Sequence, residues 1–180
     1  MIALTSHPTR TDHEPTDLDR LVGEHAAGVF RYLRTLVGDG ETARDLVQDT
    51  FLRLHPHASQ AGAGLVFTVA RSCALDHLRR RRWRQRHEQP GSEHCDQTPD
   101  GSGALPDRTY ADLEFRQHLE AALAALPEDQ RTVFHLSEIE GLPYADIAAV
   151  LGVSAGTVAS RKHHAVRKLR TALRRLGHAT

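Results

Sequence analysis

Two stretches of this sequence concentrate positive charge in a way that suits contact with a polyanion. The first, RRRRWRQR at residues 79–86, holds six arginines in eight residues. The second follows Ser154 and carries seven cations with no acid: Arg161, Lys162, Arg167, Lys168, Arg170, Arg174 and Arg175. Such side chains neutralise phosphates and release condensed counterions, which supplies much of the affinity of nucleic-acid binding. The chain as a whole is nevertheless neutral, with 23 Lys and Arg against 23 Asp and Glu.

The second stretch lies in a helix-turn-helix pattern. Ile147 and Leu151 are one helical turn apart, and Gly152 after them allows a tight turn. Ser154 is a good N-cap for the next helix, and Val158 can fill the angle between the two helices. Solvated amphipathic helices usually mix Glu with Lys for pairing. Because this helix has no acid, the pattern favours a DNA-reading helix over an ordinary basic surface.

Helix is the regular structure that the composition favours. Ala, Leu and Arg dominate, aromatic residues make up 5%, and the alternation typical of strands is almost absent. Apolar residues at three- and four-residue spacing predict helices over residues 17–37, 41–55 and 65–87, and again from about 111 to the end. We therefore expect an all-α protein with two small helical domains joined by a flexible acidic linker. The predicted parts are a loose tail over 1–16, a first domain over 17–87, a linker over 88–111 and a second domain over 112–177.

Capping residues and helix breakers set the predicted boundaries. Thr16 or Asp17 can cap the first helix, and GDG at residues 38–40 ends it. Pro56 ends the second helix, and residues 57–64 are predicted to form a loop. In the second domain, Pro127 suits the first turn of a helix that Gly141 closes.

The predicted linker carries much of the acid that balances the arginines. Between residues 88 and 114 there are seven acids and one base, a net charge of −6. About 26 residues can stretch to roughly 85 Å at ~3.3 Å each, which exceeds two turns of DNA. A relaxed coil of that length averages only about 28 Å. The two domains can therefore reach separated sites on DNA only when the linker is drawn out.

Several other classes of protein are not supported by the sequence. Cys73 and Cys95 do not form a disulfide framework, which favours a reducing cytoplasm, and Cys73 falls on an apolar stripe. There is no apolar segment of a signal peptide and no run of about eighteen apolar residues, so neither export nor membrane insertion is expected. The 13 histidines lack zinc-ligand spacing, no cofactor motif is present, and no catalytic motif suggests an enzyme.

The motifs taken together resemble those of a bacterial protein family. LPEDQRTVFHLSEIEGLPYADIAAVLGVSAGTVASRKHHAVRKLR is similar to the fourth conserved region of sigma-70 family RNA polymerase sigma factors, of the extracytoplasmic-function (ECF) group. DLVQDTFLRL and FTVARSCALDHLRRRR are similar to the second region, and the regions occur in family order. The resemblance implies a transcription initiation factor that binds core RNA polymerase and promoter DNA. It also implies an anti-sigma factor as a partner.

The resemblance assigns roles to individual residues. The β′ clamp helices of polymerase would meet the DLVQDTF helix through Asp45, Gln48, Asp49 and Leu52, and the second domain would meet the β flap. By their residue types alone, Asp45 and Asp49 fit ordinary solvent exposure better than a binding surface.

The third predicted helix would face the −10 promoter element. The residues implied are Arg71, Ser72, Asp76, Arg79 and Arg80. Ser72 stands where the family commonly has Asn, and its single hydroxyl cannot make a bidentate amide contact with a base. Leu65 replaces a family Trp, and the preceding loop is short and lacks an aromatic residue. These departures leave the −10 sequence preference undefined.

The second helix of the helix-turn-helix would enter the major groove at the −35 element. The residues implied are Thr157, Ser160, Arg161, His163, His164 and Arg167. Ala159 replaces a family Lys or Arg, which removes one expected contact. His163 and His164 are an unusual pair, and we hypothesise that their protonation strengthens −35 binding at lower pH.

Two other functions remain open from the residues. A stand-alone helix-turn-helix regulator would use residues 18–87 for sensing or dimerisation and would not need the DLVQDTF surface. A sigma mimic that sequesters an anti-sigma factor would not need the basic reading helix.

Overall fold

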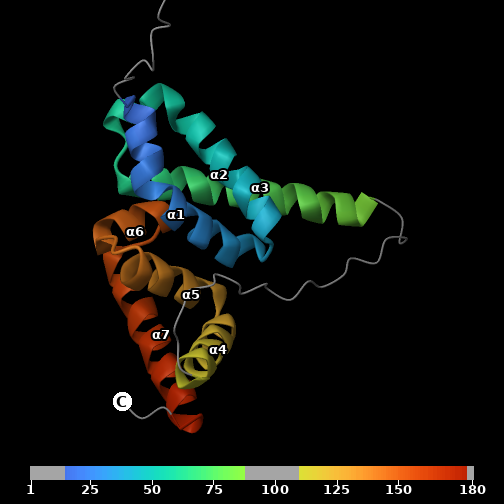
Figure 1. Ribbon diagram of the computed structural model, residues 1–180, viewed down its shortest axis with the longest axis vertical. Helices are drawn as coiled ribbons and strands as arrows, with labels where there is room; N and C mark the ends of the chain where they lie inside the picture. Colours follow the sequence, from blue (N-terminus) through green and yellow to red (C-terminus); the bar gives the residue numbers. More distant parts are fainter. Residues whose placement is uncertain (1–14, 88–109, 178–180) are drawn as a thin grey trace, which may run out of the picture.

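The computed structural model describes residues 15–87 and 110–177, and every regular element in these two ranges is helical (Figure 1). The all-α fold predicted from the composition is therefore confirmed for this part of the chain. The tail predicted over 1–16 and the linker predicted over 88–111 lie almost entirely outside the described residues.

The first domain consists of three long helices, α1 (Asp17–Val37), α2 (Gly40–Leu54) and α3 (Ala63–His87). Thr16 begins α1 through a capping box. Its side chain accepts a hydrogen bond from Asp19 N at 3.2 Å, and the Asp19 carboxylate accepts from Thr16 N at 2.9 Å. Gly38 ends α1 with a left-handed φ of 80°, and Asp39 then caps α2. These boundaries agree with those predicted from the sequence.

The connection between α2 and α3 is more regular than predicted. A 3₁₀ helix, η1 (His55–Gln60), occupies part of the expected loop, because Pro56 lacks an N–H and suits the first turn of a short helix. Helix α3 begins at Ala63, two residues before the predicted start at Leu65. Gly64 belongs to the loop predicted over residues 57–64, and glycine has a low helix propensity. Here Gly64 is helical and lies against Asp146 of the second domain, so a tertiary contact overrides the local preference.

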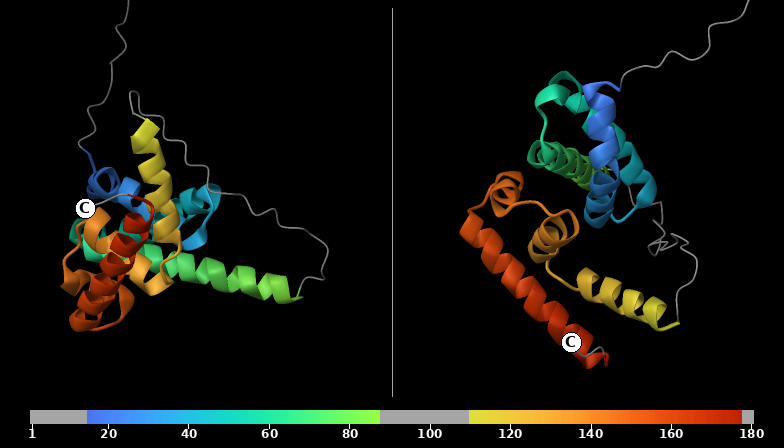
Figure 2. Two further views of the ribbon diagram at one scale, coloured as in Figure 1. Left: turned by 90° about the horizontal axis from the view of Figure 1, so that it is seen from below. Right: turned by 60° about the vertical axis from the view of Figure 1, so that its left-hand side comes forward.

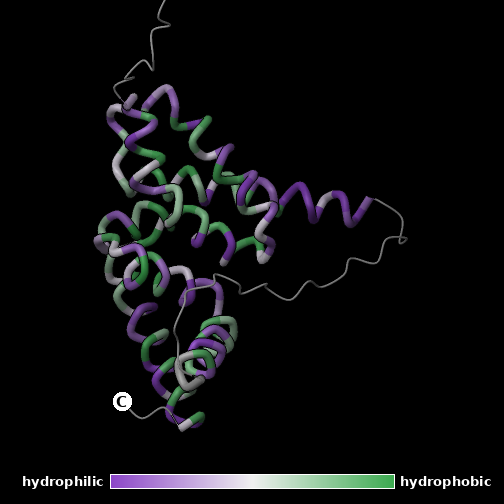
Figure 3. The backbone as a smooth tube through the Cα atoms, viewed as in Figure 1, coloured by the Kyte–Doolittle hydropathy of each residue, from purple (hydrophilic) through white to green (hydrophobic). Residues whose placement is uncertain are grey.

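The three helices bury an aliphatic core. Its fully buried members include Val29, Tyr32, Leu33, Leu54, Val66 and Cys73. The burial of Cys73 confirms its predicted place on the apolar stripe. Leu65, although apolar and at the start of the same helix, is 42% exposed, because the helix phase that turns Val66 and Phe67 inward turns Leu65 outward. The arginine-rich half of α3 projects beyond the bundle as a hydrophilic rod (Figures 1 and 3).

The second domain contains four α-helices and a short π-helical turn within the described range. These are α4 (Tyr110–Ala124), α5 (Glu128–Phe134), η2 (His135–Ile139), α6 (Tyr144–Leu151) and α7 (Ala155–Arg175). Pro127 immediately precedes α5, and Gly141 follows η2 with a φ of 69°. Gly152 turns the chain from α6 into α7 with a φ of 65°. The predicted helix-turn-helix is thus confirmed.

The two domains lie against each other. Helix α6 packs on α3, and the views in Figures 1 and 2 both place α5 and α6 beside the first domain. Buried residues of both domains form one continuous apolar cluster, to which the second domain contributes Val133, Leu136, Leu142, Ile147, Val150 and Val158. The sequence pattern predicted two tethered domains and gave no sign of this shared core.

Candidate nucleic-acid interface

Helix α7 presents one continuous polar face. Ser154 begins the helix by accepting a hydrogen bond from Thr157 N at 3.1 Å. At 100° per residue, one side of the helix carries all six side chains predicted for the −35 element: Thr157, Ser160, Arg161, His163, His164 and Arg167. The opposite side is buried through Val158, Ala165 and Leu169. The structure therefore gathers these six residues on the side of α7 that faces away from the core.

Two cations near the start of α7 are held by acids of the same domain. Arg161 Nη2 lies 2.6 Å from an Asp129 carboxylate oxygen in α5, and Arg161 is only 27% exposed. Lys162 Nζ lies 2.5 Å from Glu138 Oε1 and 5.3 Å from the ring centre of Tyr144. The hydrogen bond to Glu138 raises the pKa of Lys162. The Arg161 guanidinium is therefore paired with a carboxylate in the structure.

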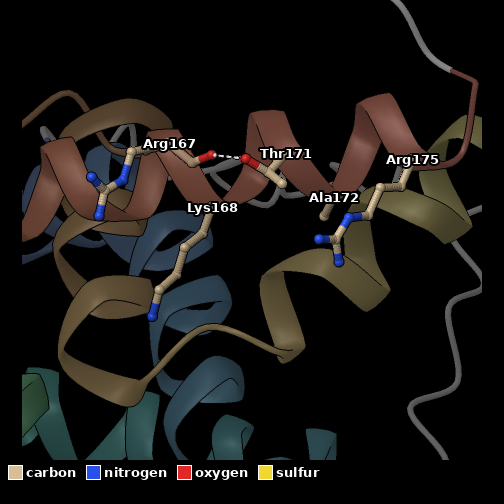
Figure 4. Close-up of a pocket in the computed structure, with 5 residues that line it drawn as sticks. All are labelled: Arg167, Lys168, Thr171, Ala172 and Arg175. Atoms are coloured by element: carbon tan, nitrogen blue, oxygen red, sulfur yellow. Dashed lines mark hydrogen bonds between the residues drawn. The ribbon is translucent and has the colours of Figure 1, made fainter.

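The basic face continues along the second half of α7. Arg167, Lys168, Thr171, Ala172 and Arg175 line an open depression of about 320 Å³ (Figure 4). Thr171 donates a hydrogen bond to the carbonyl of Arg167 at 2.9 Å, and Lys168 and Arg175 extend from the same side of the helix. The depression is shallow and cationic, which suits contact with a phosphate backbone better than enclosure of a small molecule.

Helix α3 divides the side chains predicted for the −10 element into two groups. Ser72, Asp76 and Arg79 share a face, and Asp76 already accepts from Arg79 at 3.4 Å and lies 3.5 Å from Arg53. Arg80 is exposed at the edge of this face. Arg71 is half-buried on another side of the helix. Four of the five predicted residues therefore lie together, and Arg71 lies on another side of α3.

Arg71 lies beside Tyr32 of α1 rather than in solvent. Burial raises the pKa of Tyr32 to about 12, and the nearby Arg71 guanidinium opposes that rise. Further along α3, Trp83 is 62% exposed and stacks on His87 with 4.5 Å between ring centres. An exposed indole in an arginine-rich helix offers a flat surface on which a nucleobase could stack.

Helix α2 carries a second exposed surface of opposite charge. Asp45, Gln48, Asp49 and Leu52 fall within one side of the helix, and all four are exposed. Leu52 is 70% exposed, the most of any large apolar side chain among the described residues. We call this set the α2 face. Two carboxylates followed by an exposed leucine form a surface suited to a basic protein partner that also makes an apolar contact.

Comparison with known proteins decides the family. Residues 21–84 match the family model described as sigma-70 region 2, and residues 116–169 match that described as sigma-70, region 4. The chain is 40% identical over 163 residues to the ECF RNA polymerase sigma factor SigL of Mycobacterium tuberculosis. The aligned residues cover 87% of this chain and 89% of SigL. The chain belongs to the ECF RNA polymerase sigma factors. It is a transcription initiation factor that directs RNA polymerase to promoters.

Solved structures of similar proteins agree with this membership. The sigma factor resembles RpoE of Bartonella quintana, solved in complex with the anti-sigma factor NepR, with 25% identity and a TM-score of 0.65. That match covers 88% of this chain and 97% of RpoE. The sigma factor also shares its fold with CnrH, which was solved in complex with the cytosolic domain of CnrY, at 22% identity and a TM-score of 0.59. That match covers 87% of this chain and 86% of CnrH.

Each surface described above lies within one of the two matched family regions. The α2 face and the polar side of α3 lie in region 2, and the basic side of α7 lies in region 4. Within the described residues no cluster of three or more His, Cys, Asp or Glu could hold a metal ion. Among those same residues, no helix is both long and apolar enough to cross a bilayer.

Sequence reasoning missed four residues that meet between the two domains of the sigma factor. Arg31 and Tyr32 come from α1, whereas His135 and Glu140 come from the second domain. Tyr32 could have been found, because it follows Val29 at the spacing of the apolar stripe. Glu140 gave no signal, since SEIEG at residues 137–141 has the composition of an exposed helix end.

Proposed function

We propose that the α2 face binds the β′ clamp helices of core RNA polymerase, while region 4 reaches the β flap and reads the −35 element through α7. The polar side of α3, with Ser72, Asp76, Arg79 and Arg80, contacts the −10 element. Arg71 joins it only after a local rearrangement, because it lies on another side of α3, beside Tyr32. The protein acts by placing polymerase on DNA and catalyses no reaction itself. Its place of action is the cytoplasm, where polymerase and promoters are.

The observation that carries this proposal is the presence of two separate surfaces of opposite character. The basic side of α7 suits DNA, and a stand-alone helix-turn-helix regulator would need that surface alone. The α2 face, with its exposed Leu52 beside Asp45 and Asp49, has no use in DNA contact, because its carboxylates would repel phosphates. A sigma mimic, by contrast, would need the α2 face without the acid-free helix α7. A sigma factor needs both.

We also propose that an anti-sigma factor binds this protein. The support is the likeness, over 97% of its length, to RpoE of Bartonella quintana, which was solved in complex with an anti-sigma factor. The exposed α2 face and the cationic side of α7 are the surfaces whose covering would prevent action on polymerase and on DNA.

Charge reversal on the α2 face tests the polymerase assignment. The double variant Asp45→Arg, Asp49→Arg should bind core polymerase at least tenfold more weakly than the unmodified protein, as measured by co-elution and by fluorescence anisotropy of labelled protein. The matched control is Glu114→Arg, Glu120→Arg, which makes the same charge change at exposed positions of α4. The control should bind normally, because its reversed charges lie away from the α2 face.

Two results would contradict the proposal in different ways. Equal binding by the α2 variant and the α4 control would remove the α2 face from the polymerase interface. Tight, specific binding of promoter duplex by the free protein, with no binding to core polymerase, would instead support a stand-alone regulator.

A further inference from the structure

Helix α3 carries an exposed tryptophan near its end. Residues 79–87 belong to the hydrophilic part of the helix that projects from the bundle in Figure 1. Trp83 is 62% exposed, although an indole is among the side chains that gain most from burial. The ring therefore contributes little to the core of the first domain, and much of its surface is open to a ligand.

His87 holds the indole on one side. The two rings stack with 4.5 Å between their centres and an angle of 24° between their planes. His87 Nδ1 lies 2.8 Å from the carbonyl oxygen of Trp83, and it donates this hydrogen bond because a carbonyl only accepts. The imidazole is thus fixed both at its face and at its edge. An indole that is already held against one ring loses little further freedom when a second ring stacks on its open face.

Trp83 lies on the side of α3 that carries Ser72, Asp76 and Arg79. It follows Asp76 by seven residues, which is about two helical turns, so the two side chains point the same way. Two turns rise roughly 10 Å, which corresponds to about three nucleotides at ~3.4 Å each. A DNA strand that runs along this side of α3 therefore reaches the indole about three nucleotides from Asp76.

The same part of the helix supplies cations for the phosphates of such a strand. After Asp76, α3 has six arginines and no acid before it ends at His87. Arg80 and Arg86 flank Trp83 at three residues on either side, and both are exposed. Single-stranded nucleic acid is bound by this combination, since bases stack on the aromatic ring while phosphates lie against the cations.

The open face of the indole selects an unpaired base over a paired one. Within a duplex, the neighbouring bases cover both faces of each base, so an aromatic side chain stacks fully only on a base that has left the helix. Transcription requires the two promoter strands to separate, which exposes such bases beside the side of α3 that contacts the −10 element.

We propose that Trp83, supported by His87, stacks on an unpaired base of the melted promoter, while Arg80 and Arg86 bind the phosphates on either side of that base. This inference rests on the proposed function, because it takes α3 to lie along the −10 element. The other use of an indole at this position is to shield the end of the helix. Shielding requires neither the exposure of the ring nor its place on the same side as Asp76.

Intrinsic fluorescence tests the stacking, because Trp83 is the single tryptophan of the chain. The free protein is titrated with a short oligothymidylate and, separately, with a mixed-sequence duplex of the same length. Oligothymidylate is a valid probe because stacking on an aromatic ring tolerates any base. The single strand should quench the fluorescence roughly twofold or more, whereas the duplex should leave it nearly unchanged.

Variants separate stacking from charge. Measured by anisotropy of labelled oligothymidylate, Trp83→Leu should bind about fivefold or more weakly, and Trp83→Phe, which keeps a flat ring, should retain most of the affinity. The matched control Gln85→Leu changes an exposed residue on the opposite side of the same helix and should bind normally. Arg86→Gln should weaken binding of single strand and duplex alike and should lower the salt slope by about one.

Transcription with core polymerase tests whether the base belongs to the promoter. The templates are a promoter duplex and the same promoter with a mismatched, pre-melted −10 region. Trp83→Leu should reduce transcription from the duplex about fivefold or more, and Trp83→Phe should restore most of it. The loss should be smaller on the pre-melted template, because strand separation there no longer depends on the stacked base.

The outcomes separate this inference from the proposed function. Equal quenching by duplex and single strand, or unchanged oligothymidylate affinity in Trp83→Leu, would overturn the stacking site. Normal transcription by Trp83→Leu, an equal loss on both templates, or tighter binding of oligouridylate than of oligothymidylate would overturn its assignment to melted promoter DNA. Failure of the unmodified protein to bind core polymerase would instead refute the proposed function, whereas the oligothymidylate titration needs no polymerase.

Discussion

The pairing of Arg31 with Glu140 should behave as a coupled unit in the free energy of unfolding. The perturbation is a double-mutant cycle made of Arg31→Met, Glu140→Gln and the two together. Both replacements keep the approximate length of the side chain, so the cycle removes charge and hydrogen bonds with little change in packing.

The magnitudes follow from the unequal burial of the two partners. Arg31→Met leaves a 6% exposed carboxylate that keeps His135 beside it, and should lower the free energy of unfolding by about 3 kcal/mol. Glu140→Gln leaves a guanidinium that is 50% exposed and can turn to water, so its cost should be about 1–2 kcal/mol. Because each single variant breaks the same interaction, the coupling energy should be about 2 kcal/mol. The exposed pair Arg20–Asp17 should show about 0.5 kcal/mol or less.

Urea unfolding at pH 7.5, followed by circular dichroism, measures all members of the cycle. A parallel cycle of Asp17→Asn and Arg20→Met serves as the control on a solvent-exposed pair. A coupling energy below about 0.5 kcal/mol for Arg31 and Glu140 would refute the reasoning. A larger loss for Glu140→Gln than for Arg31→Met would refute the burial argument in particular.

Three further predictions concern single sites. Burial lowers the pKa of His135, so the unfolded chain takes up a proton near pH 6.5 that the folded protein resists, and the stability present above that pH is lost as pH falls. In urea unfolding, the free energy of unfolding of His135→Gln should therefore fall less between pH 7.5 and pH 5.5 than that of the unmodified protein. Equal losses in the two proteins would contradict this cause. Ser154→Ala removes the cap of α7 and should cost about 1 kcal/mol in thermal unfolding, whereas an unchanged melting temperature would show that the cap is dispensable. The complex of the sigma factor with polymerase should bind promoter duplex more tightly at pH 6 than at pH 8. The double variant His163→Gln, His164→Gln should show a smaller difference between these pH values. An unaltered pH profile in the double variant would remove both histidines from −35 recognition.

Local signals in the sequence predicted most of the secondary structure. Thr16, Gly38, Gly152 and Ser154 each act at a helix end through their own backbone or side chain, so their roles need no knowledge of the rest of the fold. Period-three and period-four apolar spacing likewise placed Val29, Leu33 and Leu46 in the core. The residues of the α2 face and of the α7 polar side share a face for the same reason, since a helix alone fixes that geometry.

The contact between the domains could not be predicted in this way. Glu140 is buried only because Arg31, 109 positions away, lies opposite it and Gly28 leaves space for its carboxylate. The residues that flank Glu140 and Arg31 in the sequence are like those that flank exposed charged residues. Arg71 was assigned to DNA by the family motif, and only the three-dimensional packing places it beside Tyr32. Gly64 belongs to the predicted loop over residues 57–64. In the structure it is helical, because its contact with Asp146 outweighs the low helix propensity of glycine.

Promoter-directed initiation is the most direct test of the central claim that this chain is a sigma factor acting through its α2 and α7 surfaces. The protein is combined with core polymerase and fragmented DNA of its host, and the 5′ ends of the transcripts are mapped. We expect a set of new start sites that share two upstream sequence elements and that disappear with Asp45→Arg, Asp49→Arg. A profile of start sites identical to that of core polymerase alone would contradict it.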